Sequence, residues 1–151
     1  MASNSDGPLR ERVAIVTGAA QGIGRATTLL LTSRGAQVVA VDLDADALAL
    51  LAQRVVGVTP LTADTRRVQD VAEVVAKALS FAGHIDILVN LVGGSTALGA
   101  TRSSFTEVSA EDWKALLDLN LTSTVNCCRA AIRAMRAPLR QDRERLLDCC
   151  P

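Results

Sequence analysis

The sequence predicts an α/β fold: a doubly wound, Rossmann-like parallel sheet with strand order 3-2-1-4 in three αβα layers, lacking the later strands of such sheets. Two observations support this prediction. Short runs of branched apolar residues alternate with amphipathic stretches of helical period, which is typical of parallel strands joined by right-handed crossovers. A glycine-rich turn, TGAAQGIG at residues 17–24, follows the first run and opens the first helical stretch, as in the first crossover of doubly wound sheets.

Each predicted strand is a short apolar run bounded by glycine or polar residues. In chain order, the four runs are Arg12–Thr17, Ala36–Asp42, Val55–Asp64 and Ile85–Asn90. Helices are expected to separate and follow them, at Arg25–Arg34, Asp44–Arg54, Val68–Leu79 and Glu111–Arg136. Asp44 is the expected N-cap of the second helix, and Ser109 with Asp112 resembles a capping box before the fourth. Pro138 is expected to end that last helix because it lacks a backbone donor.

Composition indicates one globular domain without an obvious macromolecular partner. The 151 residues are 49% hydrophobic with zero formal net charge, so no general attraction to nucleic acid or to an anionic membrane is expected. The start, MASNSDGPLR, lacks the apolar core of a secretory signal, and no apolar run is long enough to span a membrane. A cytoplasmic location is therefore expected. The two adjacent cysteine pairs and the single histidine, His84, lack the spacing of a metal site, so no metal is expected.

The glycine-rich turn fits a phosphate-binding role. Gly18, Gly22 and Gly24 allow a sharp turn, close approach of the backbone to a pyrophosphate, and tight packing of the helix on the strand. The helix that follows offers free N–H groups and the positive end of its dipole to an anion. We therefore expect a bound dinucleotide here, and the alternative is a tight turn without a ligand.

Asp42 ends the second predicted strand, 18 residues after Gly24. A carboxylate at this point accepts hydrogen bonds from the ribose hydroxyls of an adenosine and repels a 2′-phosphate, which favours NAD over NADP as the cofactor. The alternative is that Asp42 only begins the turn before the next helix.

The spacing Gly-x-x-x-Gly-x-Gly resembles that of the short-chain dehydrogenase/reductase family, whose members are NAD(P)-dependent oxidoreductases on a single Rossmann domain. The segments AD at 63–64, HIDILVNLVGG at 84–94 and LDLNLTS at 117–123 resemble further motifs of this family in the same order. The resemblance extends from about Leu9 to Arg136. It implies cofactor contacts from Thr17, Gly18, Gln21, Gly22, Ile23, Gly24, Asp42, Asp64, Thr65, Asn90 and Gly93.

The resemblance also carries finer implications. Asn120 matches the asparagine that helps to order a proton-relay water. Gln21 stands where NADP-preferring members often place a basic residue, which again favours NAD. Simpler structural roles stay open: Asp64 or Thr65 as N-cap of the following helix, Asn90 holding the end of its strand, and Asn120 bonded only to neighbouring backbone.

The family's chemistry needs residues that this chain lacks. Its members use a tyrosine as acid and base, a lysine four residues later that lowers the pKa of that tyrosine, and a serine that polarises the substrate carbonyl. The 151 residues contain no tyrosine. The family implies small carbonyl or alcohol substrates, as for 3-oxoacyl reductases, but we expect this chain to be inactive alone. The alternative is a non-catalytic dinucleotide-binding module that associates with an intact homologue.

The tail RAPLRQDRERLLDCCP at 136–151 breaks the pattern of the preceding chain. When its codons are read one nucleotide later from Leu139, they permit YGKIVNVSSIAA, which resembles the family's fifth strand and its serine-bearing end. We therefore expect a frameshift near residues 136–138, with 1–8 a disordered N-terminus, 9–136 a partial dinucleotide-binding domain and 137–151 an aberrant tail. A basic interaction arm is the alternative. With the later strands absent, the helix at 111–136 would lose its cover on one face, which favours a homo-oligomer.

Overall fold

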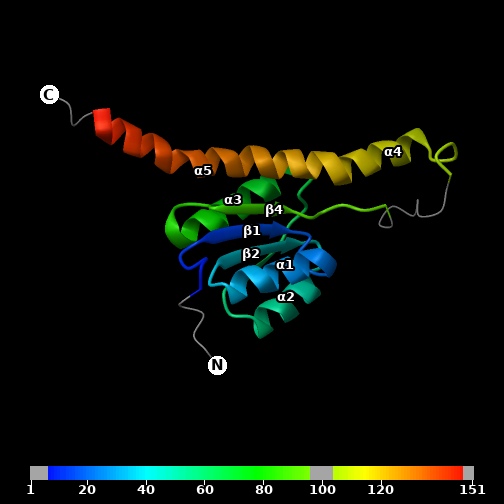
Figure 1. The fold of residues 1–151 in the computed structure, drawn as a ribbon. Helices are drawn as coiled ribbons and strands as arrows, with labels where there is room; N and C mark the ends of the chain where they lie inside the picture. Colours follow the sequence, from blue (N-terminus) through cyan, green and yellow to red (C-terminus); the bar gives the residue numbers. More distant parts are fainter. Residues whose placement is uncertain (1–6, 96–103, 148–151) are drawn as a thin grey trace.

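The structure is a computed structural model, and it describes residues 7–95 and 104–147, with side chains as far as residue 136. One four-stranded sheet lies between two layers of helices (Figure 1). Its order is β3-β2-β1-β4 and every neighbouring pair is parallel, so the predicted topology is confirmed. The strands are β1 (Val13–Thr17), β2 (Gln37–Asp42), β3 (Val58–Thr62) and β4 (Ile87–Asn90).

Helices cover both faces of the sheet (Figure 1). On one face lie α1 (Gly22–Ser33) and α2 (Ala45–Arg54), and on the other lie α3 (Val68–Ala82) and α5 (Ser123–Leu147). A shorter helix, α4 (Ala110–Leu117), precedes α5 and is joined to it by one π-helical turn, η3 (Asp118–Thr122). The three segments follow one another as a single long rod across the molecule (Figure 1).

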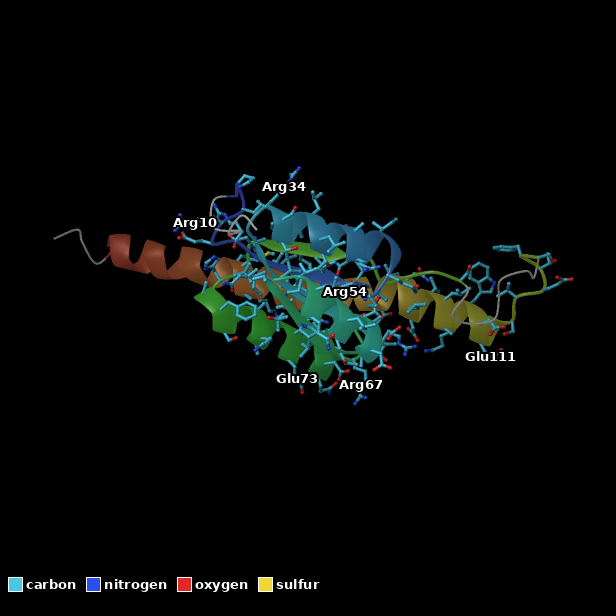
Figure 2. The ribbon with its side chains drawn as sticks, turned by 90° about the horizontal axis from the view of Figure 1, so that it is seen from below. Arg10, Arg34, Arg54, Arg67, Glu73 and Glu111 are labelled. Carbon is cyan, nitrogen blue, oxygen red and sulfur yellow. The ribbon has the colours of Figure 1, made fainter. Side chains whose placement is uncertain are left out.

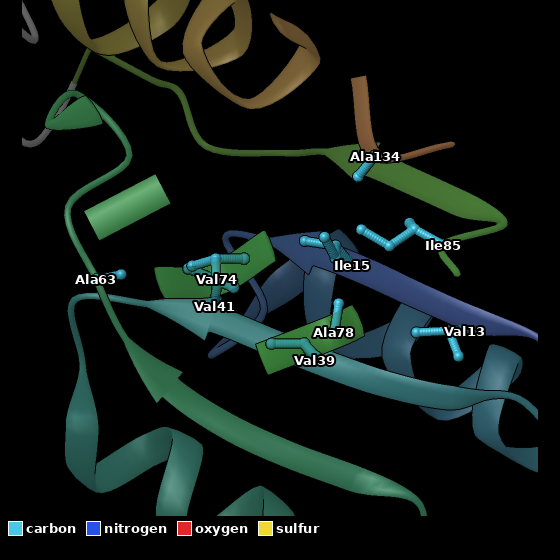
Figure 3. Packing of buried hydrophobic residues seen from close by; sticks show 9 residues of the cluster. All are labelled: Val13, Ile15, Val39, Val41, Ala63, Val74, Ala78, Ile85 and Ala134. Atoms are coloured by element: carbon cyan, nitrogen blue, oxygen red, sulfur yellow. The ribbon is translucent and has the colours of Figure 1, made fainter. Parts of the chain in front are cut away.

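Successive residues of a strand point to opposite faces of the sheet, so the two central strands contribute to two separate cores. The core beneath α3 and α5 contains Val13, Ile15, Val39, Val41, Ala63, Val74, Ala78, Ile85 and Ala134 (Figure 3). The core above α1 and α2 contains Ala14, Val16, Ala19, Ala36, Val38, Ala40, Leu48 and Leu51. Burial on both faces explains why these strands are continuous apolar runs in the sequence. It also fixes the positions of their carboxyl ends.

The predicted caps form as expected. Asp44 accepts a hydrogen bond from the Ala47 N–H at 2.9 Å and so caps α2. Ser109 Oγ accepts from the Asp112 N–H at 3.0 Å and donates to the Asp112 carboxylate at 2.9 Å, which caps α4. Gly83 closes α3 in the left-handed region, at φ 75°.

The predicted helices differ from the structure in three main respects. The first helix begins at Gly22 rather than Arg25, because the last glycines of the turn already form its first helical turn. The predicted single helix at 111–136 is interrupted by η3, which no periodicity in the sequence revealed. The prediction that Pro138 ends the last helix was wrong, since α5 continues to Leu147. A proline removes one hydrogen bond of a helix, and the glutamine, arginine, glutamate and leucine residues that follow are strong helix formers.

Candidate functional site

A cleft of about 510 Å³ opens at the carboxyl ends of the strands, where the glycine-rich turn leaves β1. Ligands of open parallel sheets bind at this edge. Most of the residues predicted to contact a cofactor line it, namely Gly18, Gln21, Gly22, Ile23, Gly24, Asp42, Asp64, Thr65 and Gly93. The other lining residues were not predicted as contacts; Ala63, Leu91, Val92 and Leu119 lie inside the quoted motifs, and Leu43 lies outside them.

The glycine-rich turn forms an open cradle at the start of α1. Gly18 has a φ of +68°, and a Cβ added at Gly24 would lie 1.9 Å from the Gly18 carbonyl oxygen. Only glycine lets the helix pack this closely on the turn. By contrast, nothing lies within 4 Å of a Cβ added at Gly22, whose φ is +52°. The first N–H groups of a helix have no intrahelical partner, and the N-cap residue Gln21 provides no side-chain cap. The cradle therefore suits a pyrophosphate.

Asp42 links the end of β2 to this cradle. One oxygen of its carboxylate accepts from the Ala20 N–H at 3.0 Å, and the other accepts from the N–H groups of Leu43 and Asp44 at 2.8 and 3.2 Å. The second pair of contacts forms the turn before α2, the simpler role considered for this residue. Because Asp42 also lines the cleft, its carboxylate combines this local role with a position open to a ribose.

Asp64 and Thr65 follow β3 and form the far wall of the cleft. Asp64 forms an ion pair with Arg66, at 2.7 Å between the Arg66 Nη2 and the Asp64 Oδ2. These hydrogen bonds from Arg66 lower the pKa of Asp64 although burial opposes the shift. Neither residue is the N-cap of α3, which is Arg67, so that alternative was wrong. The turn between β3 and α3 places both residues too early in the chain for capping.

Asn126 of α5 holds the turn that forms this wall. Its side-chain amide donates to the carbonyl oxygens of Thr65 and Arg66 at 3.2 and 3.0 Å, across about sixty residues of sequence. No motif in the sequence pointed to this residue. The available signal was an asparagine in the middle of a helix whose neighbours are largely apolar.

Two predicted residues lie beside the cleft rather than in it. Thr17 is buried, and its hydroxyl oxygen accepts from the Leu91 N–H at 3.1 Å, which holds the start of the β4 loop against β1. Asn90 donates to the Cys128 Sγ at 3.4 Å, while its buried Oδ1 has no partner in the described part of the chain. Both side chains therefore support the cleft without lining it.

Asn120 lies in the π-turn and holds the loop after β4. Its Oδ1 accepts from the Gly94 N–H at 2.9 Å, and its amide donates to the carbonyl oxygens of Gly94 and Leu116 at 3.1 and 2.9 Å. A Cβ added at Gly93 would lie 2.6 Å from the same Oδ1. The π-turn also brings Leu119 into the cleft, in keeping with the frequent use of π-turns at functional sites.

The sequence of this chain matches the family model described as short chain dehydrogenase over residues 12–144. The chain belongs to the short-chain dehydrogenase family. Members of this family bind NAD(P), and the parallel sheet of order 3-2-1-4 with helices on both faces agrees with that assignment.

Similar proteins cover a range of oxidoreductases. The chain is 34% identical over 132 residues to a 3-oxoacyl-(acyl-carrier-protein) reductase of Thermotoga maritima, covering 84% of this chain and 51% of that protein. It is 37% identical over 131 residues to a D-threitol dehydrogenase of Mycolicibacterium smegmatis, covering 82% and 47% of the two chains. Among solved structures, a 3-ketoacyl-(acyl-carrier-protein) reductase of Brucella melitensis complexed with NADH superimposes with a TM-score of 0.75 at 28% identity, covering 83% and 50%. The chain thus spans about half the length of the relatives that it matches.

Within residues 7–95 and 104–136, whose side chains the structure describes, no three His, Cys, Asp or Glu side chains come together as metal ligands would. None of the described helices is long and apolar enough to cross a membrane.

Proposed function

We propose that this chain binds the adenosine and pyrophosphate half of NAD in the cleft at the carboxyl edge of the sheet. The observation that carries the proposal is the cradle at the start of α1, where Gly22 leaves open space beside the free N–H groups of the helix. Asp42 stands next to it at the end of the neighbouring strand. Under this proposal, the pyrophosphate lies at the end of β1, the ribose at the end of β2 and the base at the end of β3.

NAD is proposed over NADP because the cleft presents an acid where a 2′-phosphate would lie. Asp42 carries the charge, and Gln21 supplies no compensating cation. Titration calorimetry with both cofactors tests this preference. Asp42→Asn should improve the affinity for NADP relative to NAD by about tenfold, since it removes a like-charge repulsion. Asp46→Asn, an exposed acid in the first turn of α2, removes the same charge away from the cleft and should leave the ratio unchanged.

In a longer form of the protein, the same cleft would serve a dehydrogenase or reductase of small carbonyl and alcohol compounds. The similarity to 3-oxoacyl reductases supports 3-oxoacyl thioesters as the first substrates to test. For the 151 residues themselves we propose binding without turnover, because they contain no tyrosine to act as acid and base. The test is NADH oxidation with a 3-oxoacyl thioester, where turnover above the background rate would contradict this proposal.

The long rod of α4, η3 and α5 supports self-association as a second part of the proposal. It presents an apolar stripe of partly exposed side chains, Trp113, Leu117, Leu121, Val125 and Ile132. Leu117, Leu121 and Val125 follow one another at intervals of four residues around the π-turn. The π-turn inserts one extra residue, so these three side chains stay on one face of the rod. Up to residue 136, the charged residues near the start of the rod are three acids and one lysine, and those further along are three arginines: Glu111, Asp112, Lys114 and Asp118, then Arg129, Arg133 and Arg136. Over this part, an antiparallel pair of rods would bring mostly opposite charges together.

The oligomeric state in solution tests this surface. Light scattering should give twice the mass of one chain, and Leu121→Glu should give a single chain because it places a charge in the stripe. Leu30→Glu, at a similarly exposed leucine on α1, should not change the mass. Association with an intact homologue instead of a second copy is the other candidate, since the same stripe would be buried.

We also propose a cytoplasmic location, where the free thiols of Cys127 and Cys128 would stay reduced.

A further inference from the structure

Both oxygens of the Asp64 carboxylate accept hydrogen bonds from Arg66. Its Oδ1 accepts from the Arg66 backbone N–H at 3.0 Å and from the Arg66 Nε at 2.9 Å. Its Oδ2 accepts from the same Nε at 3.1 Å and from the Arg66 Nη2 at 2.7 Å. A carboxylate offers about four acceptor positions, and Arg66 covers most of them with three N–H groups, since its Nε–H is shared between the two oxygens.

The two partners face different surroundings. Asp64 lines the cleft, whereas Arg66 is not among its lining residues. The guanidinium therefore binds the carboxylate on the side away from the cleft and leaves the cleft open. Arg66 also lies near the acidic π-turn, since the charges of Asp64 and Asp118 both raise the pKa of Arg66.

The turn that carries the pair is held on both sides. The Asp64 N–H donates to the Asp70 carboxylate at 3.0 Å, and the Arg66 carbonyl oxygen accepts from the Asn126 amide at 3.0 Å. With its backbone fixed in this way, Arg66 is preorganised over Asp64. A ligand that needs the carboxylate must displace a bidentate guanidinium.

We propose that Arg66 is a specificity-determining residue of the base subsite, because it occupies the acceptor that Asp64 would offer to the exocyclic amino group of an adenine. The inference rests on the proposed function. The base is placed at β3 by the order of the strands, with the pyrophosphate at β1 and the ribose at β2. Because Arg66 occupies the Asp64 carboxylate, this subsite should bind two kinds of purine with similar affinity. One kind presents an amino donor, and the other presents a carbonyl at the same position.

The test compares NAD with nicotinamide hypoxanthine dinucleotide, in which a carbonyl replaces the amino group. For the wild-type chain, titration calorimetry should give similar dissociation constants for the two. Arg66→Ala should tighten NAD by about twofold to fivefold, the value of a partly exposed ion pair that no longer competes. It should leave the dissociation constant of the hypoxanthine analogue unchanged or raise it. The ratio of that constant to the dissociation constant of NAD therefore rises.

Matched variants separate this effect from a change of net charge or of folding. Arg34→Ala removes the same charge at the exposed C-terminal end of α1, outside the cleft (Figure 2), and should leave the ratio at its wild-type value. Arg66→Lys keeps the charge but loses the bidentate geometry, and should give an intermediate ratio even if the alanine variant is unstable.

The outcomes distinguish the two levels of the proposal. If the wild-type chain binds neither dinucleotide, the proposed function fails. If it binds NAD, but Arg66→Ala and Arg66→Lys both keep the wild-type ratio, the role of Arg66 is overturned while the proposed function stands.

Discussion

The packing of Gly24 against Gly18 makes the most demanding prediction about stability. A Cβ at Gly24 would lie 1.9 Å from the Gly18 carbonyl oxygen and 2.6 Å from its carbonyl carbon. A carbon and a carbonyl oxygen normally stay about 3.3 Å apart. Gly24→Ala must therefore move the start of α1 away from the turn by about 1.4 Å. The obstacle is backbone, so no side chain can rotate to relieve it.

The expected cost follows from two opposing effects. Overpacking in a tight site costs about 1–3 kcal/mol, and a rigid backbone neighbour places this site at the upper end. Alanine gains about 1 kcal/mol over glycine in a helix. The net loss of unfolding free energy should be about 2 kcal/mol, which is about a thirtyfold fall in the ratio of folded to unfolded chains. Binding of NAD should weaken as well, because the helix start and the cradle move apart.

Urea unfolding followed by circular dichroism measures this loss. With a typical denaturant dependence, the midpoint should fall by about 1 M. Gly22→Ala is the matched control: its φ of +52° strains an alanine, but its Cβ meets no atom within 4 Å. It should cost about 1 kcal/mol from strain alone. Equal losses for the two variants would refute the reasoning, because the close contact would then contribute nothing.

Two further predictions concern the far wall of the cleft and the response to acid. Asn126→Ala should lower the unfolding free energy by about 1–2 kcal/mol and weaken NAD binding, because the carbonyl groups of Thr65 and Arg66 lose their donor; unchanged thermal unfolding and affinity would contradict this. Asp64 and Asp86 have pKa values lowered from 3.8 in the folded chain. Burial of Asp86 opposes its shift, which hydrogen bonds from the Val13 N–H and the Arg12 side chain outweigh. Carboxyl groups whose pKa is lowered on folding stabilise the fold above about pH 4, and this contribution is lost as the pH falls through their folded pKa values. The urea midpoint should therefore be constant near neutrality and drop below about pH 4.

Local signals in the sequence predict most of this architecture because each was a short-range physical preference. The runs that become β1 and β2 are buried on both faces, so their composition alone identified them. Asp44 and Ser109 were recognisable as caps because a cap depends on residues only three positions apart. The glycine-rich turn was recognisable for the same reason, since its conformation is set within eight residues.

The features that the sequence did not reveal depend on contacts between distant residues. Asn126 reaches the turn after β3 across about sixty residues, and no local pattern records that meeting. The grip of Arg66 on Asp64 is close in sequence, but its importance appears only once Asp64 lies in the cleft. The π-turn leaves the spacing of apolar residues nearly helical, which hides it from any periodicity. The course of α5 through Pro138 reflects competition between one lost hydrogen bond and a strongly helical segment, and the sequence rule considered only the first.

The most direct test of the account is a calorimetric comparison of ADP-ribose with NAD on the 151-residue chain. ADP-ribose carries the adenosine, the pyrophosphate and the second ribose but no nicotinamide. If the cleft recognises the adenosine and pyrophosphate half, both ligands should bind with dissociation constants within about threefold of each other, a difference below 1 kcal/mol. Binding of NAD without measurable binding of ADP-ribose would contradict the account, because recognition would then depend on the nicotinamide.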